Sequence, residues 1–358
     1  MSLRIVDADA HVIETTDTFR YLRPNESRYC PIQLQQTWGS GEISEKGNVY
    51  KNFWLIDKSV YPVGKNSQMG GTTADTRELR DIDGRLRHMD EMEVDVQVLY
   101  PTLFLAAKTS DPEWEYALIR SYNRWMADAW AKSENRLRWV AIPPLRTMDR
   151  VRDELEFCKD NGACGIFLVG LECDKQLDHP YFYPLWEMAQ ELDLAACVHS
   201  GNHSLENITF CGESRTGDRF VMNRSPGVNA FHVLLADDVP GMFPKVRWGF
   251  VEFSASWLPY VMHYQSINKN RKNLDKPFDA KTLLTRKNMY VACQVTEDLN
   301  YLVSVVGEDC LVIGTDYGHN DTASEIRAMQ LLRDQGKVPA RVVDKILETN
   351  ARRLYGLN

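Results

Sequence analysis

The chain has 358 residues, of which 44% are hydrophobic and 26% are charged, and this composition is ordinary for a globular protein with a sizeable core. Its formal net charge of −8, without a stripe of lysine and arginine, excludes a typical nucleic-acid or anionic-membrane partner. The sequence shows neither a run of about 18 apolar residues nor a signal-like start, so we expect a cytoplasmic protein without a membrane span.

Short apolar runs alternate with segments of helical period along the chain, a pattern typical of βα units around a parallel sheet. The runs predict about eight strands, at residues 4–9, 95–100, 138–142, 164–169, 195–199, 246–252, 289–294 and 311–316. The amphipathic segments predict helices at residues 77–92, 112–133, 149–161, 183–192, 255–270, 296–306, 322–336 and 340–355. We therefore predict an α/β fold, a single (β/α)8 TIM barrel over residues 1–358 with extra C-terminal helices.

Two segments interrupt this alternation. Residues 15–76 hold many prolines and glycines, together with Trp38 and Trp54, and they show little periodic patterning. We expect a long insertion after the first strand, on the active-site side of the barrel, that acts as a lid or as a subunit contact. The expected assembly is a homo-oligomer or a pair with a paralogous subunit. Residues 201–227 form a second polar, glycine-rich stretch that would hang over the site.

Acidic and imidazole side chains stand at the ends of several predicted strands. Asp9 and His11 lie two positions apart, so they point the same way on an extended strand. His199, Glu252 and Asp316 close or follow other apolar runs. Strand ends meet at one face of a barrel, so we expect these five residues to bind a divalent metal. The alternatives are a strand-end salt bridge for Asp316 and pairing of Glu252 with loop arginines.

The ligand types restrict the metal. Oxygen-rich sets with some imidazole suit zinc, manganese or iron, and the number of ligands is sufficient for two ions. The eight cysteines are dispersed without a C-x-x-C pair, so we expect reduced core residues rather than thiolate ligands.

Further polar residues are candidates for contact with a small-molecule substrate. His203 and His319 closely follow two of the predicted ligands in the sequence. Arg215, with Arg219 and Arg224 in the same loop, could grip a substrate carboxylate, because a guanidinium fork matches that geometry. Surface placement of these arginines is the alternative.

The chain resembles the amidohydrolase-related metalloenzymes, which include aminocarboxymuconate-semialdehyde decarboxylase and the resorcylate decarboxylases. The motifs are Asp9-x-His11, the run 94–101, Val198-His199-Ser200-Gly201 and Gly314-Thr-Asp316-Tyr-Gly-His319. The resemblance implies a (β/α)8 barrel that holds a divalent ion through Asp9, His11, His199 and Asp316. It also matches His232 to a catalytic histidine that faces substrate, although His232 lies on an apolar helical face where core histidines are common.

One position departs from the family pattern. The decarboxylases usually carry a histidine after the sixth strand, whereas this chain has Glu252. A glutamate beside a cation stays ionised and tends to bind it, so Glu252 is both a predicted ligand and a candidate catalytic residue. This replacement weakens the decarboxylase interpretation.

Three reactions fit such a site, and we expect a metal-dependent hydrolase or carboxy-lyase for a small carboxylate or amide-type substrate. In hydrolysis, Asp316 accepts a proton from metal-activated water. In non-oxidative decarboxylation, His232 or Asp316 donates a proton to carbon. The alternative is an iron- or manganese-type oxygenase with two ions, similar to 2-aminoisobutyrate hydroxylase of the same superfamily. A metal-bearing scaffold subunit is the non-catalytic alternative.

Overall fold

Eight parallel strands form a closed sheet in the computed structural model, which describes residues 4–36, 42–43, 49–50, 52–63, 71–212, 220–269 and 278–357. The order around the barrel is β1–β7–β8–β9–β12–β13–β14–β15. Their bounds are Val6–His11, Val96–Tyr100, Leu137–Ala141, Ala163–Val169, Ala195–His199, Trp248–Val251, Met289–Cys293 and Leu311–Ile313. The predicted α/β TIM barrel is confirmed.

The barrel closes between β1 and the segment that follows β15. The His11 amide donates to the carbonyl of Tyr317 at 2.8 Å, and the Asp316 amide donates to the carbonyl of Asp9 at 2.9 Å. A Cβ on Gly314 would lie 2.4 Å from the Cβ of Asp9, so this close approach requires glycine. Closure therefore places Asp316 directly beside Asp9 and His11.

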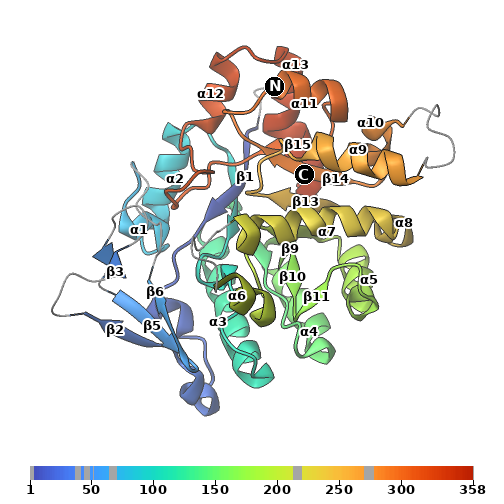
Figure 1. Ribbon diagram of the computed structural model, residues 1–358. Helices are drawn as coiled ribbons and strands as arrows, with labels where there is room; N and C mark the ends of the chain where they lie inside the picture. Colours follow the sequence, from blue (N-terminus) through green and yellow to red (C-terminus); the bar gives the residue numbers. More distant parts are fainter. Residues whose placement is uncertain are drawn as a thin grey trace.

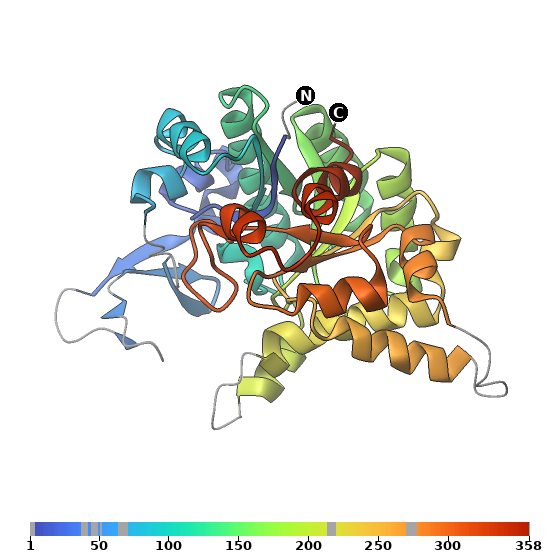
Figure 2. The same cartoon turned by 90° about the horizontal axis from the view of Figure 1, so that it is seen from above.

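Helices surround the barrel, as Figures 1 and 2 show. Those of the β/α units are α1 Ala74–Arg77, α2 Ile82–Glu91, α3 Pro112–Ala131, α4 Val151–Asp160, α5 Tyr183–Glu191, α6 Leu205–Gly212, α7 Ser225–Ala236, α8 Val239–Met242, α9 Leu258–Lys269, α10 Ala280–Arg286 and α11 Leu299–Val306. The chain ends in α12 Ala328–Asp334, α13 Ala340–Asp344 and α14 Asn350–Tyr355, so the predicted extra C-terminal helices are confirmed.

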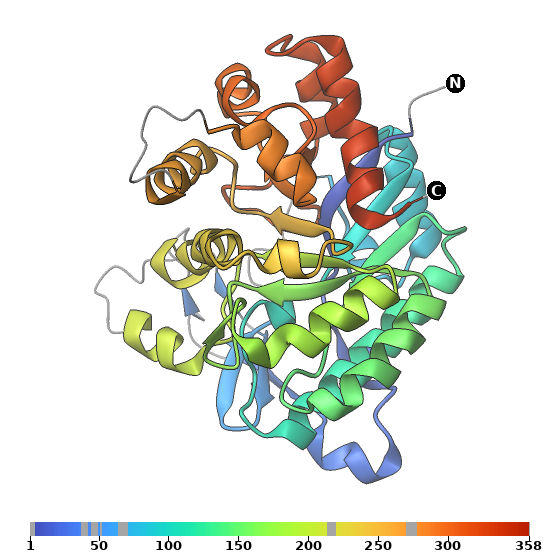
Figure 3. The ribbon, with the colours of Figure 1, turned by 90° about the vertical axis from the view of Figure 1, so that its right-hand side faces the viewer.

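The core explains why the strands are visible in the sequence. All seven residues of β9 and all five of β12 are buried, because helices cover the outside of the sheet and side chains fill its inside. Helix α14 packs at the other end of the barrel, where Tyr355 donates a hydrogen bond to the carbonyl of Ala8 at 2.6 Å. The two chain ends lie on the same side of the molecule (Figure 3).

The insertion after β1 contains a small antiparallel sheet of β2 Ile32–Gln35, β5 Asn52–Ile56 and β6 Ser59–Pro62, in the order β2–β5–β6. Two short pairs are β3 Glu42–Ile43 with β4 Val49–Tyr50, and β10 Leu171–Glu172 with β11 Lys175–Gln176. Tyr61 of β6 donates a hydrogen bond to the carbonyl of Ala107, and Asp57, in the turn between β5 and β6, accepts one from Thr109. Ala107 and Thr109 lie in the loop after β7. A role as lid or subunit contact stays a prediction. Among the described residues, no helix has the length and apolar character to cross a bilayer.

Candidate metal centre

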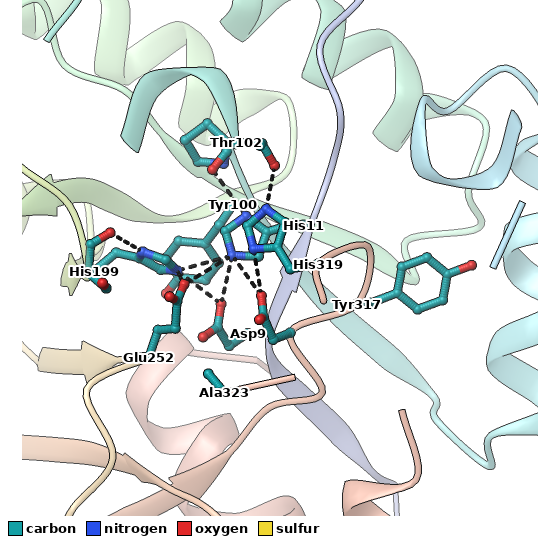
Figure 4. A network of polar contacts seen from close by, with 12 residues as sticks. Asp9, His11, Tyr100, Thr102, His199, Glu252, Tyr317, His319 and Ala323 are labelled. Atoms are coloured by element: carbon teal, nitrogen blue, oxygen red, sulfur yellow. Dashed lines mark hydrogen bonds and ion pairs between the residues drawn. The ribbon is translucent and has the colours of Figure 1, made fainter. Parts of the chain in front are cut away.

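Six buried side chains from four strand ends meet at the mouth of the barrel (Figure 4). They are Asp9 and His11 of β1, His199 of β12, Glu252 after β13, and Asp316 and His319 after β15. The structure thus brings together all five predicted ligands, while metal binding by them stays a prediction. It also places His319, which we predicted to contact substrate, inside the same cluster.

Two overlapping sets of four donors make up the cluster. In each set, one ligand atom per residue lies within 4.8 Å of the other three. The first set is Asp9, His11, His199 and Glu252, and the second is His11, Glu252, Asp316 and His319. His199 Nε2 lies 3.4 Å from Asp9 Oδ1 and 3.0 Å from Glu252 Oε2. His11 Nε2 lies 3.1 Å from His199 Nε2 and 3.4 Å from Asp316 Oδ1.

Three buried carboxylate oxygens of the cluster accept no well-aligned hydrogen bond. They are Asp9 Oδ1, Glu252 Oε2 and Asp316 Oδ1. Their polar neighbours are imidazole nitrogens, with His199 Nε2 3.0 Å from Glu252 Oε2 and His319 Nδ1 2.8 Å from Asp316 Oδ1. A buried carboxylate oxygen without an aligned donor is costly, because it has lost water. Divalent cations in the two donor sets would satisfy all three oxygens. The donor set, with hard oxygens and imidazole nitrogens, therefore fits manganese, iron or zinc.

The two histidines at the centre are oriented as metal ligands. His11 Nδ1 lies 3.1 Å from the carbonyl of Pro101, and His199 Nδ1 lies 2.8 Å from the carbonyl of Ser200. A carbonyl only accepts, so each Nδ1 carries a proton and each Nε2 is left to face the cluster. Both Nε2 atoms point into the cluster, which is the orientation that metal-binding histidines usually have.

Burial and neighbouring charges shift the pKa values of the cluster. Burial, aided by the His319 ring, lowers the pKa of His11 well below its ordinary value, so this imidazole is neutral. Burial also disfavours a charge on His199, but Glu252 and Asp9 outweigh it and raise the pKa of His199. Burial raises the pKa of Asp316 to about 8, although His319 opposes the shift. A bound cation would displace the protons that these groups retain.

The backbone is strained where two of the carboxylates enter the site. Glu252 has φ of 63° and Asp316 has φ of 53°, in the left-handed region that residues other than glycine rarely adopt. Such conformations persist only where the surrounding structure enforces them, and they concentrate at functional sites. Here each turn directs a carboxylate toward the cluster at the point where its strand ends.

A turn after β7 supports the two histidines of the second set. Glu14 accepts hydrogen bonds from the amides of Thr102 at 3.1 Å and Leu103 at 2.7 Å. Thr102 Oγ1 lies 2.8 Å from His319 Nε2, and Pro101 of the same turn faces His11. Sequence reasoning missed Thr102, because it considered only acidic and imidazole side chains at the ends of the predicted strands.

The remaining candidates lie elsewhere. His203 bonds to Glu172 Oε2 at 2.8 Å and to the carbonyl of Phe104 at 2.6 Å, outside both donor sets. The structure does not bring His232 to the cluster, because the turn of α7 directs its ring toward Gln265 and Tyr264 of α9. The expected catalytic role of His232 therefore has no support in the geometry. Arg215 lies outside the described residues.

Comparisons with known proteins agree with this architecture. The family model described as Amidohydrolase matches residues 6–357. A gamma-resorcylate decarboxylase of Polaromonas sp. (strain JS666 / ATCC BAA-500) is 28% identical over 127 residues, which cover 34% of this chain and only 39% of that relative.

Solved structures show the same fold. An amidohydrolase from Mycobacterium avium subsp. paratuberculosis K-10 has a TM-score of 0.76 at 18% identity and covers 99% of this chain and 100% of its own. A dihydroxybenzoic acid decarboxylase from Polaromonas sp. JS666, solved with bound manganese and the inhibitor 2-nitroresorcinol, has a TM-score of 0.66 at 18% identity, with 100% and 98% coverage. With the family model matched over nearly its whole length, the chain belongs to the amidohydrolase family of enzymes.

Proposed function

We propose that the chain is a divalent-metal-dependent enzyme that hydrolyses a small carboxylate- or amide-type substrate. The observation that supports this most strongly is the convergence of three carboxylate oxygens and two imidazole Nε2 atoms on one buried centre. Asp9, His11, His199 and Glu252 would hold the ion. When bound, the metal supplies Lewis acidity, which lowers the pKa of water to about 7 and polarises a substrate carbonyl.

Asp316 is the proposed proton acceptor. Its Oδ2 is fixed by a hydrogen bond from Ser324 Oγ at 2.6 Å, and its Oδ1 faces the cluster. A carboxylate held in this way can take up a proton from water and release it later. His319 Nδ1, 2.8 Å from Asp316 Oδ1, holds the carboxylate in place and stabilises its charge.

Non-oxidative decarboxylation is the second candidate, and the similarity to gamma-resorcylate decarboxylase favours it. In that reaction Asp316, in its protonated form, would donate its proton to the carbon that loses carbon dioxide. Glu252 weakens the decarboxylase assignment, because this carboxylate stands where those enzymes usually carry a histidine. The two overlapping donor sets fit two ions as well as one. None of the relatives described above is an oxygenase, so we do not propose oxygenation.

A paired substrate panel tests the proposal. Protein loaded with manganese or zinc would be incubated with esters, lactones and amides, and separately with phenolic carboxylates such as dihydroxybenzoate. We expect metal-dependent release of a carboxylic acid from the first group. Release of carbon dioxide from the second group would instead establish the decarboxylase. No turnover together with no metal uptake would leave only a scaffold role.

A further inference from the structure

A second pocket lies beside the metal centre, between the loop after β7, helix α3 and the ends of β8 and β9. Its cavity volume is about 40 Å³, and about 540 Å³ of empty space lies between its walls when the open solvent at its mouth is counted. None of the six cluster residues lines it. Phe167 separates the two sites, since its ring centroid lies 6.1 Å from that of His199 and 6.0 Å from that of His203. Its apolar walls include Phe104, Leu118, Ile119, Ile142 and Phe167.

Most charges in this pocket are already paired. Arg146 Nε forms an ion pair with Glu115 Oε1 at 3.2 Å without a well-aligned hydrogen bond, and the Arg146 amide donates to the other oxygen of Glu115 at 3.0 Å. His203 Nδ1 lies 2.8 Å from Glu172 Oε2. Each carboxylate thus has its own cation, and neither needs a charge from a ligand.

Lys108 is the exception. Within the described ranges, its ammonium has no ion pair and donates no hydrogen bond, and it lies over the face of the Tyr61 ring, 4.0 Å from the centroid. Burial lowers the pKa of Lys108 to about 7, although Glu14 acts in the opposite direction. Lys108 is partly buried, and an ammonium that loses part of its water without gaining an anion destabilises a fold. Where a protein keeps such an unpaired charge without a compensating interaction, a functional reason is expected.

We propose that this pocket binds a small organic carboxylate, which pairs with the Lys108 ammonium and packs its apolar part against Phe104, Ile142 and Phe167. The unpaired ammonium of Lys108 favours a ligand with a negative charge, and the apolar walls favour a ligand whose remaining part is apolar. The site is separate from the metal centre, so it does not depend on the reaction proposed above. It would take either an effector or the distal carboxylate of a substrate, since both present the same chemistry.

Ligand-observed fluorine NMR tests this with trifluorobutanoate and its uncharged amide as probes. The native protein should bind the acid at least about ten-fold more tightly than the amide, because a charge-assisted hydrogen bond is lost in the amide. Lys108→Met should abolish that preference. Lys58→Met, which removes an exposed lysine from the turn between β5 and β6, should leave it intact. A preserved preference in Lys108→Met would overturn the proposal.

Three further measurements complete the test. Ala107→Phe, which adds bulk to the pocket wall without touching a charge, should weaken both probes, and unchanged binding would place them elsewhere. Removal of metal with a chelator should leave acid binding unchanged. Loss of binding after chelation would put the acid on the metal centre and contradict a separate site. If the acid also competes with turnover in the loaded enzyme, it occupies the substrate's path, whereas binding without competition identifies an effector.

Discussion

The metal centre and the Lys108 pocket lie on opposite sides of Phe167 and lack opposite kinds of partner. In the metal centre, three buried carboxylate oxygens accept no well-aligned hydrogen bond, so the site offers free acceptor positions. In the pocket, Glu115 and Glu172 are each matched by a cation, and the ammonium of Lys108 is left over. The metal centre is therefore suited to a cation, and the Lys108 pocket is suited to an anion.

A buried charged group can be structural or ligand-binding, and its hydrogen-bond partners distinguish the two. His203 and His199 both contact a glutamate, yet His203 is completely hydrogen-bonded to Glu172 and Phe104. His199 instead shares its Nε2 face with two carboxylates and with a second imidazole. A satisfied pair stabilises the fold, whereas an unsatisfied group whose free atom faces an enclosed space indicates a ligand of opposite charge.

The largest expected effect concerns the proton acceptor. Asp316→Asn should lower kcat by at least about 1,000-fold on the substrate found in the panel, because the amide cannot accept a proton. The thermal midpoint should change little. Asp309→Asn, before the other end of β15, is the control and should retain native turnover. Near-native turnover of Asp316→Asn would remove this residue from the chemistry.

The next effect concerns metal affinity. His199→Ala should weaken manganese or zinc binding by at least about 100-fold, since it removes a ligand and leaves Glu252 without its partner. Isothermal titration with the metal measures this directly. His263→Ala, on the exposed face of α9, provides a control that should bind metal as the native chain does. Equal affinities in the two variants would contradict the ligand assignment.

Substitution of Glu14 should lower metal affinity less than His199→Ala does. Glu14→Ala releases the turn at Thr102 that contacts His11 and His319, so metal affinity should fall by about 10- to 100-fold. The visible spectrum of the cobalt-substituted protein should also change, and Glu14→Gln should restore part of it. Glu26→Gln alters another buried carboxylate that accepts a backbone amide, from Arg23 at 2.7 Å, and should affect stability only.

The smallest expected effect is a gain in stability. Lys108→Met should raise the thermal midpoint by about 1–3 °C, because the unpaired ammonium disappears. The pKa of Lys108 is about 7 in the fold and 10.5 in its ordinary state, so the cost of its charge is full below pH 7 and declines as pH rises toward 10.5. The difference between variant and native chain should therefore shrink between pH 6.5 and 9.5. A constant difference would mean that Lys108 acts through packing alone.

The barrel and the convergence of the candidate ligands were predictable because both depend on local rules. Buried parallel strands are continuous apolar runs, and strand ends of a barrel meet at one face, which brings Asp9, His199 and Asp316 together. The direction of the His232 ring was not predictable, since the direction that a helix face takes depends on its neighbours, here Gln265 of α9. The unpaired state of Lys108 likewise depends on which distant carboxylates approach it, and no spacing in the sequence encodes that.

Elemental analysis tests the central claim most directly. The native chain, purified without chelator, should contain at least one equivalent of manganese, iron or zinc per chain, and the His199→Ala variant should contain almost none. Metal-free native protein that also fails to take up any of these ions, with no rise in thermal midpoint on their addition, would contradict the account.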